Sequence, residues 1–192
     1  MNKNEIIEMN KTFIAVAAAL ALTPLTASAE LSIKGWTIGQ EMTECPAGFE
    51  ERSEFTFLFP EDGSKHVVTI PGTRRCLLEN TTYANISFES LYVNVFNDQV
   101  VTITLGESDG DVESFNQLID SIQRIEGEPL CHGDQTRSCS WTYRLEENEQ
   151  RLNVLLRSER LSVFLADDKH SKPFFDQIER KRNSLFRSLS DM

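Results

Sequence analysis

A regular alternation of apolar and polar residues between Trp141 and Leu165 constrains the fold of this chain more than any other feature. Three short runs follow one another, and each places three apolar side chains at every second position. These positions are Trp141, Tyr143 and Leu145, then Leu152, Val154 and Leu156, then Leu161, Val163 and Leu165. Because side chains on a strand alternate between its two faces, the spacing predicts three antiparallel strands with one buried side. Arg144, Arg151 and Arg157 mark the solvent-facing side.

Two large apolar side chains interrupt this alternation, because Leu155 and Phe164 fall on the solvent-facing side of their strands. Single exposed apolar residues are common on proteins and need no special explanation. Two positions are open to Phe164: beneath the C-terminal segment, or at an interface with a partner. We therefore name Phe164 as a candidate interaction residue.

A helix is predicted between Ser108 and Pro129, directly before these strands. Its apolar residues recur at the spacing of an amphipathic helix: Val112, Phe115, Leu118, Ile119, Ile122 and Ile125. Ser108 and Asp111 match a capping box at the start, and Gly127 with Pro129 ends the run. Because the apolar stripe must be buried, we expect this helix to cover a sheet.

Further strands are predicted before this helix. A hairpin is expected from residues 55–59 and 67–70 with a turn at 60–63, and strands are expected at 83–88, 91–96 and 100–105. Asn97-Asp98 is the predicted tight turn between the last two strands. The side chains expected to face the helix are Val93, Val95, Val101, Ile103 and Leu105. Nearer the start, Thr37 predicts a short helix that Pro46 must end.

A second long helix is predicted from Ser171 to Leu189, with Ser171 as its cap and Pro173 in its first turn. Its apolar residues are Phe174, Phe175, Ile178, Leu185, Phe186 and Leu189, which favours a helix packed on the rest of the protein. Four cations follow, Arg180, Lys181, Arg182 and Arg187, and they are candidate interaction residues. The alternative is a basic amphipathic helix that binds a membrane surface or an acidic partner.

These elements predict an α+β fold, with an antiparallel, meander-like β-sheet of about eight short strands and helices packed on one face. No Pro-, Gly- or Ser-rich linker divides the strands and helices from one another. We therefore expect residues 30–192 to form a single disulfide-stabilised domain.

Residues 1–29 have the pattern of a signal peptide. Lys11 precedes an apolar run at residues 13–22, and Ala27 and Ala29 occupy the positions that signal peptidase recognises. The run is too short to span a bilayer. Cleavage after Ala29 would leave Glu30 first rather than a lipidated cysteine, so we expect a soluble periplasmic or secreted product.

Four cysteines lie in the predicted mature part, and an exported chain is expected to oxidise them. Four cysteines allow three pairings. We favour the one that joins Cys45 to Cys76 and Cys131 to Cys139, because each pair brackets one hairpin-like segment. A zinc site built from Cys131, His132 and Cys139 is the alternative, although its spacing lacks the paired CxxC of zinc knuckles. The chain has no CxxC pair that would indicate thioredoxin-like redox chemistry.

Charge and motifs disfavour several functions. The net charge is −11, which is a poor match for nucleic acid. His66, His132 and His170 have no metal-ligand spacing, and no serine-hydrolase, zincin, P-loop or Rossmann motif occurs. The acidic run from Glu107 to Asp111 does not match a calcium loop. We therefore name no catalytic, cofactor-binding or metal-binding residue and expect no cofactor.

Several short motifs resemble small exported α+β domains of the outer-membrane assembly lipoprotein and β-lactamase inhibitor protein type. They are Gly127-Glu128-Pro129 after the helix, Trp141-Thr142-Tyr143, and the hairpin that ends at residues 161–165. The opening at residues 35–42 is similar to the glycine-threonine start of the first helix in that group. The resemblance implies short helices on an antiparallel sheet and a protein-binding scaffold rather than an enzyme. The chain departs from the group in lacking a lipidated cysteine.

The sequence therefore favours a non-catalytic, periplasmic or secreted protein-binding module of the inhibitor, immunity or envelope-accessory type. Its partner would be another protein, with a membrane surface as the lesser alternative through the C-terminal cations. The alternative function is a small hydrolase or a small-ligand-binding protein of the periplasm. The oligomeric state and the identity of the partner are left open at this point.

Overall fold

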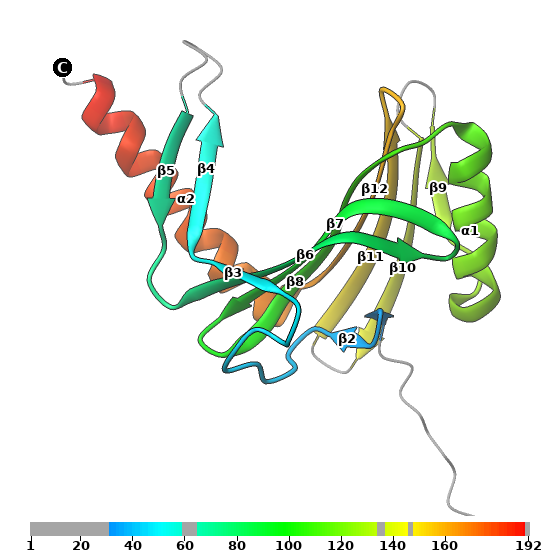
Figure 1. Cartoon of the computed structure of the whole chain (residues 1–192), viewed down its shortest axis with the longest axis horizontal. Coiled ribbons are helices and arrows are strands. Elements are labelled where there is room, and N and C mark those ends of the chain that lie inside the picture. The colour runs from blue at the N-terminus through cyan, green and yellow to red at the C-terminus, as the bar shows by residue number, and fades with distance from the viewer. Residues whose placement is uncertain (1–30, 59–64, 134–136, 146–147, 191–192) are drawn as a thin grey trace, which may run out of the picture.

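The computed structural model describes residues 31–58, 65–133, 137–145 and 148–190, and within them the chain forms an α+β fold (Figure 1). The strands are β1 (Ser32–Ile33), β2 (Trp36–Thr37), β3 (Glu50–Arg52), β4 (Glu54–Leu58), β5 (Lys65–Thr69), β6 (Thr73–Tyr83), β7 (Ile86–Phe96), β8 (Gln99–Asp109), β9 (Leu130–His132), β10 (Arg137–Leu145), β11 (Asn148–Arg157) and β12 (Arg160–Asp167). The helices are α1 (Val112–Glu126) and α2 (Asp168–Ser190). The predicted signal peptide lies outside the described residues.

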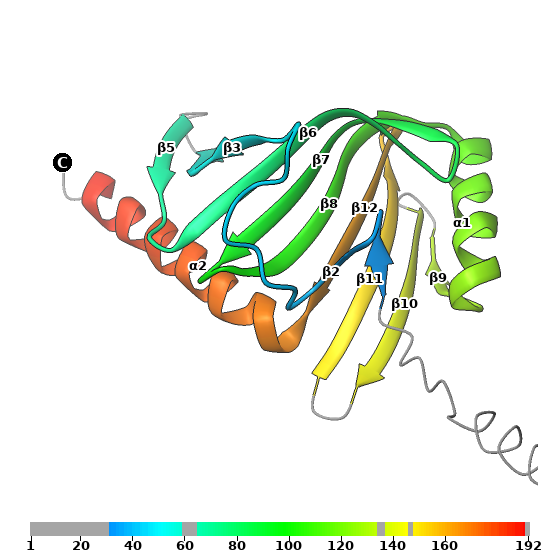
Figure 2. The same cartoon turned by 60° about the horizontal axis from the view of Figure 1, so that its bottom comes forward.

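The main sheet has eight antiparallel strands in the order β3-β6-β7-β8-β12-β11-β10-β9. It consists of two meanders, β6 to β8 and β9 to β12, that join where β8 pairs with β12 to give one curved sheet (Figure 2). Helix α1 connects the end of β8 to β9 at the far edge of the second meander. The three strands predicted from the late alternation are confirmed as β10, β11 and β12.

The remaining strands form two small hairpins. β4 pairs with β5, which confirms the hairpin predicted from the early phenylalanines, although its predicted turn at 60–63 lies outside the described residues. β1 pairs with β2 around Lys34 and Gly35, which both have positive φ. The short helix predicted at Thr37 is wrong, because the described residues of this segment contain the β2 strand and turns instead. Ile33, Ile38 and Met42 from the segment are buried in the main core.

Of the two tight turns that flank β7, one follows the sequence prediction and the other does not. Asn97 and Asp98 both have positive φ between β7 and β8, as expected for a two-residue hairpin turn. The strand predicted at 83–88 is only partly correct, because Ala84 and Asn85 also have positive φ and form a turn that leaves Tyr83 in β6 and residues 86–88 in β7. Asparagine tolerates positive φ but alanine rarely adopts it, so this dipeptide is not a typical turn signal.

Helix α1 is confirmed, with a different cap from the one predicted. Asp111 caps the helix by accepting a hydrogen bond of 2.8 Å from the Ser114 amide, whereas Ser108 is buried within β8. Gly127 ends the helix with a φ of 81°, which favours glycine. The buried α1 side chains are Phe115, Leu118, Ile119 and Ile122, and they pack in one core with inward residues of β7, β8 and β10 to β12.

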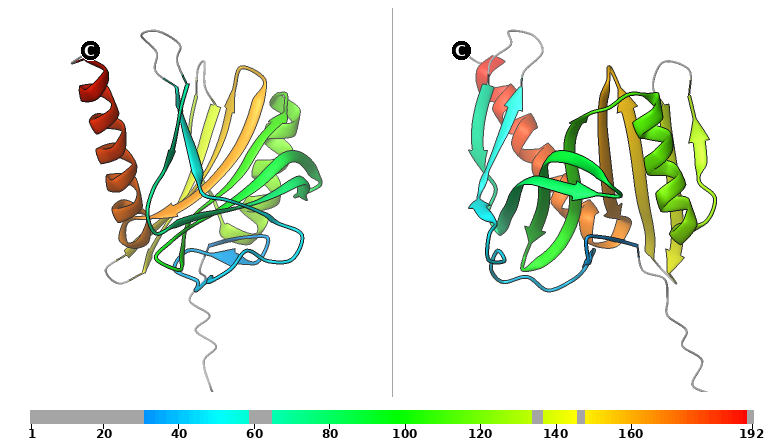
Figure 3. Two further views of the ribbon diagram at one scale, coloured as in Figure 1. Left: turned by 60° about the vertical axis from the view of Figure 1, so that its left-hand side comes forward. Right: turned by 45° about the vertical axis from the view of Figure 1, so that its right-hand side comes forward.

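Helix α1 covers one face of the sheet and helix α2 packs on the other (Figure 3). The expectation that the helices pack on one face is therefore not met by α2. Val163 and Leu165 of β12 belong to the α1-side core, while Phe164 between them contacts Phe175 of α2. Val101 was expected to face α1, but a bulge in the β7–β8 pairing turns it towards Phe174 of α2. We call the side of the sheet that carries Phe164 the α2 face.

Two disulfides join Cys45 to Cys76 and Cys131 to Cys139, which is the pairing favoured from the sequence. The described residues contain no free cysteine, so neither cysteine of the proposed zinc alternative is available as a thiolate ligand. These disulfides fit an oxidising extracellular environment. No helix in the described part of the chain is long and apolar enough to cross a membrane.

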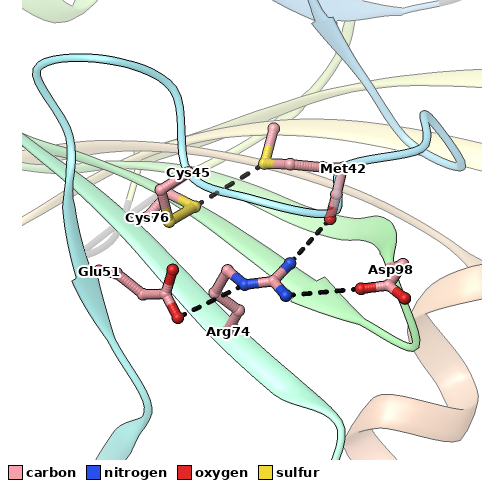
Figure 4. Close-up of a disulfide and its surroundings, with 6 residues drawn as sticks. All are labelled: Met42, Cys45, Glu51, Arg74, Cys76 and Asp98. Atoms are coloured by element: carbon pink, nitrogen blue, oxygen red, sulfur yellow. Dashed lines mark hydrogen bonds and ion pairs between the residues drawn. A yellow bond between two sulfur atoms is a disulfide. The ribbon is translucent and has the colours of Figure 1, made fainter.

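The Cys45–Cys76 disulfide lies beside a group of polar contacts around Arg74 of β6 (Figure 4). The Arg74 Nη1 donates a 2.8 Å hydrogen bond to the Met42 carbonyl, and the guanidinium also lies 3.5 Å from carboxylate oxygens of Glu51 and Asp98. The Cys76 sulfur lies 3.7 Å from the Met42 sulfur. The N-terminal segment is therefore held against β6 by both a covalent bond and an arginine.

Candidate functional site

The side chains that come closest to a catalytic arrangement surround Asp167 at the end of β12. Its Oδ2 accepts a 2.7 Å hydrogen bond from Asn148 Nδ2 and lies 2.7 Å from His170 Nδ1. Its Oδ1 accepts hydrogen bonds from the backbone amides of His170 and Ser171, at 2.6 and 3.2 Å. Asp167 therefore caps α2, a role that the sequence had suggested for Ser171.

Ser171 does not act as a nucleophile in this arrangement. Its side chain is 1 % exposed, and its Oγ donates to the Val101 carbonyl and accepts from the Asp167 amide. The His170 ring pairs with Asp167 and lies beside Gly39, and among the described residues no hydrogen bond joins the ring to the serine oxygen. Asp, His and Ser are therefore adjacent here because they fasten α2 to the sheet.

The hydrogen bonds to Asp167 also set its ionisation state. Burial raises the pKa of its carboxyl, but hydrogen bonds from His170 and Asn148 outweigh burial, so the pKa lies below its usual value. Asp167 is therefore ionised at neutral pH. His66 lies in β5 and His132 lies exposed in β9, and no group of three metal-ligand side chains occurs among the residues with described positions.

A groove with an apolar floor opens between α2 and the α2 face of the sheet. It has a volume of about 290 Å³, and its lining residues include Phe164 and Ala166 of β12, Phe175 and Lys172 of α2, and Glu149, Arg151 and Asn153 of β11. Phe175 is 42 % exposed although it contacts both Phe164 and Phe174. The sequence had named Phe164 as a candidate interaction residue, and the structure places it in this groove.

Charged residues of both signs form the rim of the groove. Arg151 lies 2.7 Å from Glu149 and 3.6 Å from Asp168, and Lys172 lies 3.3 Å from Asp176. The hydrogen bond from Arg151 lowers the pKa of Glu149 and raises that of Arg151 itself. These exposed pairs contribute little stability, so they are free to exchange partners with an incoming molecule.

Three of the four candidate cations of α2, Arg180, Lys181 and Arg182, do not line this groove. Arg180, Lys181 and Arg182 are exposed, and the side chain of Arg187 lies outside the described residues. Arg180 and Lys181 instead line a separate hollow beside Ile70 and Pro71, before β6. The structure therefore separates Phe164 from the cations that the sequence grouped with it as interaction candidates.

A larger cavity of about 520 Å³ lies between α1 and the β9–β10 edge. Phe115 and Ile119 form its apolar side, and His132, Arg137 and Ser138 add polar groups near the Cys131–Cys139 disulfide. This combination of apolar walls and a few polar side chains is typical of small-molecule sites.

Sequence reasoning missed one residue of interest, Arg75 of β6. Its guanidinium carbon lies 4.5 Å from the ring centre of Tyr92 and 5.3 Å from that of Phe55. The strand that carries Arg75 was not predicted, so no periodicity could assign the residue to a face. Because adjacent residues of a strand point to opposite faces, Arg75 lies on the α2 face and Arg74 on the opposite face, and their surroundings differ.

Comparisons of the chain with protein-family models, with curated proteins and with solved structures find no match.

Proposed function

We propose that this protein is exported, is processed after Ala29, and acts in the periplasm or outside the cell as a non-catalytic module that binds another protein. The two disulfides support export, because cytosolic chains rarely keep such bonds. The relationship to small exported α+β domains of the outer-membrane assembly lipoprotein and inhibitor type belongs to the same proposal. It rests on the short motifs already described, although the expected opening helix is absent from the described N-terminal segment.

The observation that carries the proposal is the groove around Phe164 and Phe175. Protein interfaces typically combine a small apolar or aromatic centre with a polar rim. The groove has this composition, with the two phenylalanines at its centre and Arg151, Lys172 and Glu149 at its rim. The hydrogen bonds of the nearby Asp167, His170 and Ser171 fasten α2 to the sheet, which favours binding rather than catalysis as the use of this surface.

Affinity capture with matched variants tests the proposal. The mature, oxidised protein is immobilised and exposed to envelope extract, and the retained proteins are identified. Phe175→Glu should abolish retention of the specific partner, because it places a charge in the apolar centre of the groove. Ile125→Glu is the control, since Ile125 is 79 % exposed on α1 and lies outside the groove.

Equal retention by Phe175→Glu, Ile125→Glu and the unmodified protein would refute binding through the groove. Absence of any specific partner, together with turnover of a generic ester or glycan substrate, would favour the hydrolase alternative instead.

A second candidate function is small-ligand binding in the cavity beside α1. Its volume and its mixed lining of Phe115, Ile119, His132 and Arg137 favour this alternative. A ligand bound there should protect the Cys131–Cys139 disulfide from reduction, since both cysteines line the cavity.

A membrane-surface role for α2 is the lesser alternative. It predicts that the protein binds anionic vesicles and that replacing Arg180, Lys181 and Arg182 by glutamine abolishes this binding. Unchanged vesicle binding in that variant would dismiss it.

A further inference from the structure

Arg75 is held between two aromatic rings on the α2 face of the sheet. Tyr92 belongs to the neighbouring strand β7, and Phe55 comes from the separate β4–β5 hairpin. Phe55 in turn contacts Phe174 of α2, with ring centres 5.8 Å apart. The guanidinium therefore lies where three units of the fold meet, and stacking on both rings fixes its orientation.

Arg75 is half-buried, and its side chain has no anionic partner among the described residues. In that part of the chain the guanidinium makes no ion pair and no hydrogen bond, in a protein with a net charge of −11. Its chain neighbour Arg74 contacts Glu51, Asp98 and the Met42 carbonyl. Burial lowers the pKa of Arg75, and the nearby positive charge of Arg52 lowers it further.

A second polar side chain next to Arg75 is also incompletely bonded. Asn94 is the cross-strand partner of Arg75 and donates a 2.7 Å hydrogen bond from Nδ2 to Thr102 Oγ1. Its Oδ1 is buried without a donor, and the Arg75 Nε is buried without an acceptor. Burying such atoms without a partner is unfavourable, so a ligand that lets both side chains turn and pair gains affinity.

We propose that Arg75 is the anchor of a carboxylate-binding site through which this protein recognises its partner polypeptide. A carboxylate is planar and matches the fork of a stacked guanidinium, whereas a doubly charged phosphate is disfavoured by the acidic chain. A polypeptide also offers backbone N–H groups near its carboxylates, and these supply the donor that Asn94 lacks. The inference rests on the proposed function and assigns it a recognition chemistry.

The test follows the Arg75 Nε–H signal by NMR during titration of the oxidised protein with N-acetyl-L-phenylalanine. This probe carries a carboxylate, an amide N–H and an aromatic ring. We expect a saturable shift of the Arg75 signal in the millimolar range, as is usual for a fragment of this size. N-acetyl-L-phenylalanine amide, which lacks the charge, should give no saturable shift. Equal responses to both probes, or none to the acid, would overturn the proposal.

Matched variants locate the site. Arg75→Met keeps the apolar stem between the rings but removes the fork, so it should abolish binding of the probe, followed through the backbone amides of Tyr92 and Asn94. Arg124→Met is the control, because Arg124 is exposed in the last turn of α1, on the other side of the sheet. Arg75→Lys keeps the positive charge but lacks the planar guanidinium, so it should weaken binding of the probe at least tenfold. This second variant tests the site even if Arg75→Met does not fold.

The outcome separates this inference from the proposed function. If partner capture is lost in Phe175→Glu but unchanged in Arg75→Met, the carboxylate site is refuted, whereas the proposed protein-binding function is supported. Probe binding at Arg75 without any captured partner would support the site and contradict the proposed function.

Discussion

The Asp167 carboxylate is the single group that the link between α2 and the sheet depends on most. It accepts hydrogen bonds from Asn148 and from the backbone amides of His170 and Ser171. In Asp167→Asn, one acceptor oxygen becomes an NH₂ that faces these donors. Asn148 cannot turn to compensate, because its Oδ1 already accepts from the Lys169 amide.

We therefore expect Asp167→Asn to lower the free energy of unfolding by roughly 1–3 kcal/mol at pH 7. Urea denaturation followed by circular dichroism measures this quantity. Asp176→Asn is the control, since Asp176 is exposed and forms a surface ion pair with Lys172, and it should change stability by less than about 0.5 kcal/mol. An equal effect of the two substitutions would contradict the role of Asp167 as a cap.

The same carboxylate predicts a pH dependence. The pKa of Asp167 in the folded protein lies below the ordinary value of 3.8. The contribution of this carboxylate to the free energy of unfolding is therefore fully present above that value and is lost as pH falls through the lowered pKa. The stability difference between the unmodified protein and Asp167→Asn should therefore shrink on acidification below about pH 4. A difference that grows below pH 4 would contradict the sign of the shift.

A second residue-scale prediction concerns the contact between Gly39 and His170. A Cβ added to Gly39 would lie 2.9 Å from His170 Cε1, and the residue has a φ of +85°. Gly35 has a similar φ of +81° but open space around it. Gly39→Ala should therefore be more destabilising than Gly35→Ala, by roughly 1 kcal/mol for the displaced ring. Equal losses in thermal unfolding would mean that His170 does not pack against this turn.

At the scale of elements, the period of the apolar residues predicted most of what the structure contains. Strands β10 to β12 and helix α1 follow directly from alternation and from 3.6-residue spacing. The failures occur where local chemistry gave no signal, as at the Ala84-Asn85 turn. The bulge that moves Val101 to the other face is set by pairing with β7, which a single strand's pattern cannot reveal.

The two disulfides are expected to differ in their effect on stability. Cys45 and Cys76 are 31 residues apart, whereas Cys131 and Cys139 are 8 apart. Loop-entropy arguments give about 3.7 kcal/mol for the first and about 2.6 kcal/mol for the second. Replacing each pair by alanine and measuring unfolding in urea should therefore show the larger loss for Cys45 with Cys76. The reverse order would mean that native packing, rather than the unfolded chain, controls the effect.

At the scale of the whole molecule, the sequence predicted the fold class but not the placement of its parts. The antiparallel α+β fold follows from the element pattern, whereas the joining of two meanders and the position of α2 on the opposite face depend on contacts between distant strands. The candidate site shows the same limit. Phe164 was recognised as out of pattern, but its neighbours Phe175 and Arg151 join it only through the packing of α2.

If the groove around Phe164 and Phe175 binds another protein, site-specific photo-crosslinking from within the groove should capture that protein. The photoreactive residue p-benzoyl-phenylalanine is introduced at Phe175 or, as a control, at Ile125, and the oxidised protein is irradiated in envelope extract. We expect a discrete protein adduct from position 175 and none from position 125. An adduct from position 125 alone, or from neither position, would contradict the claim.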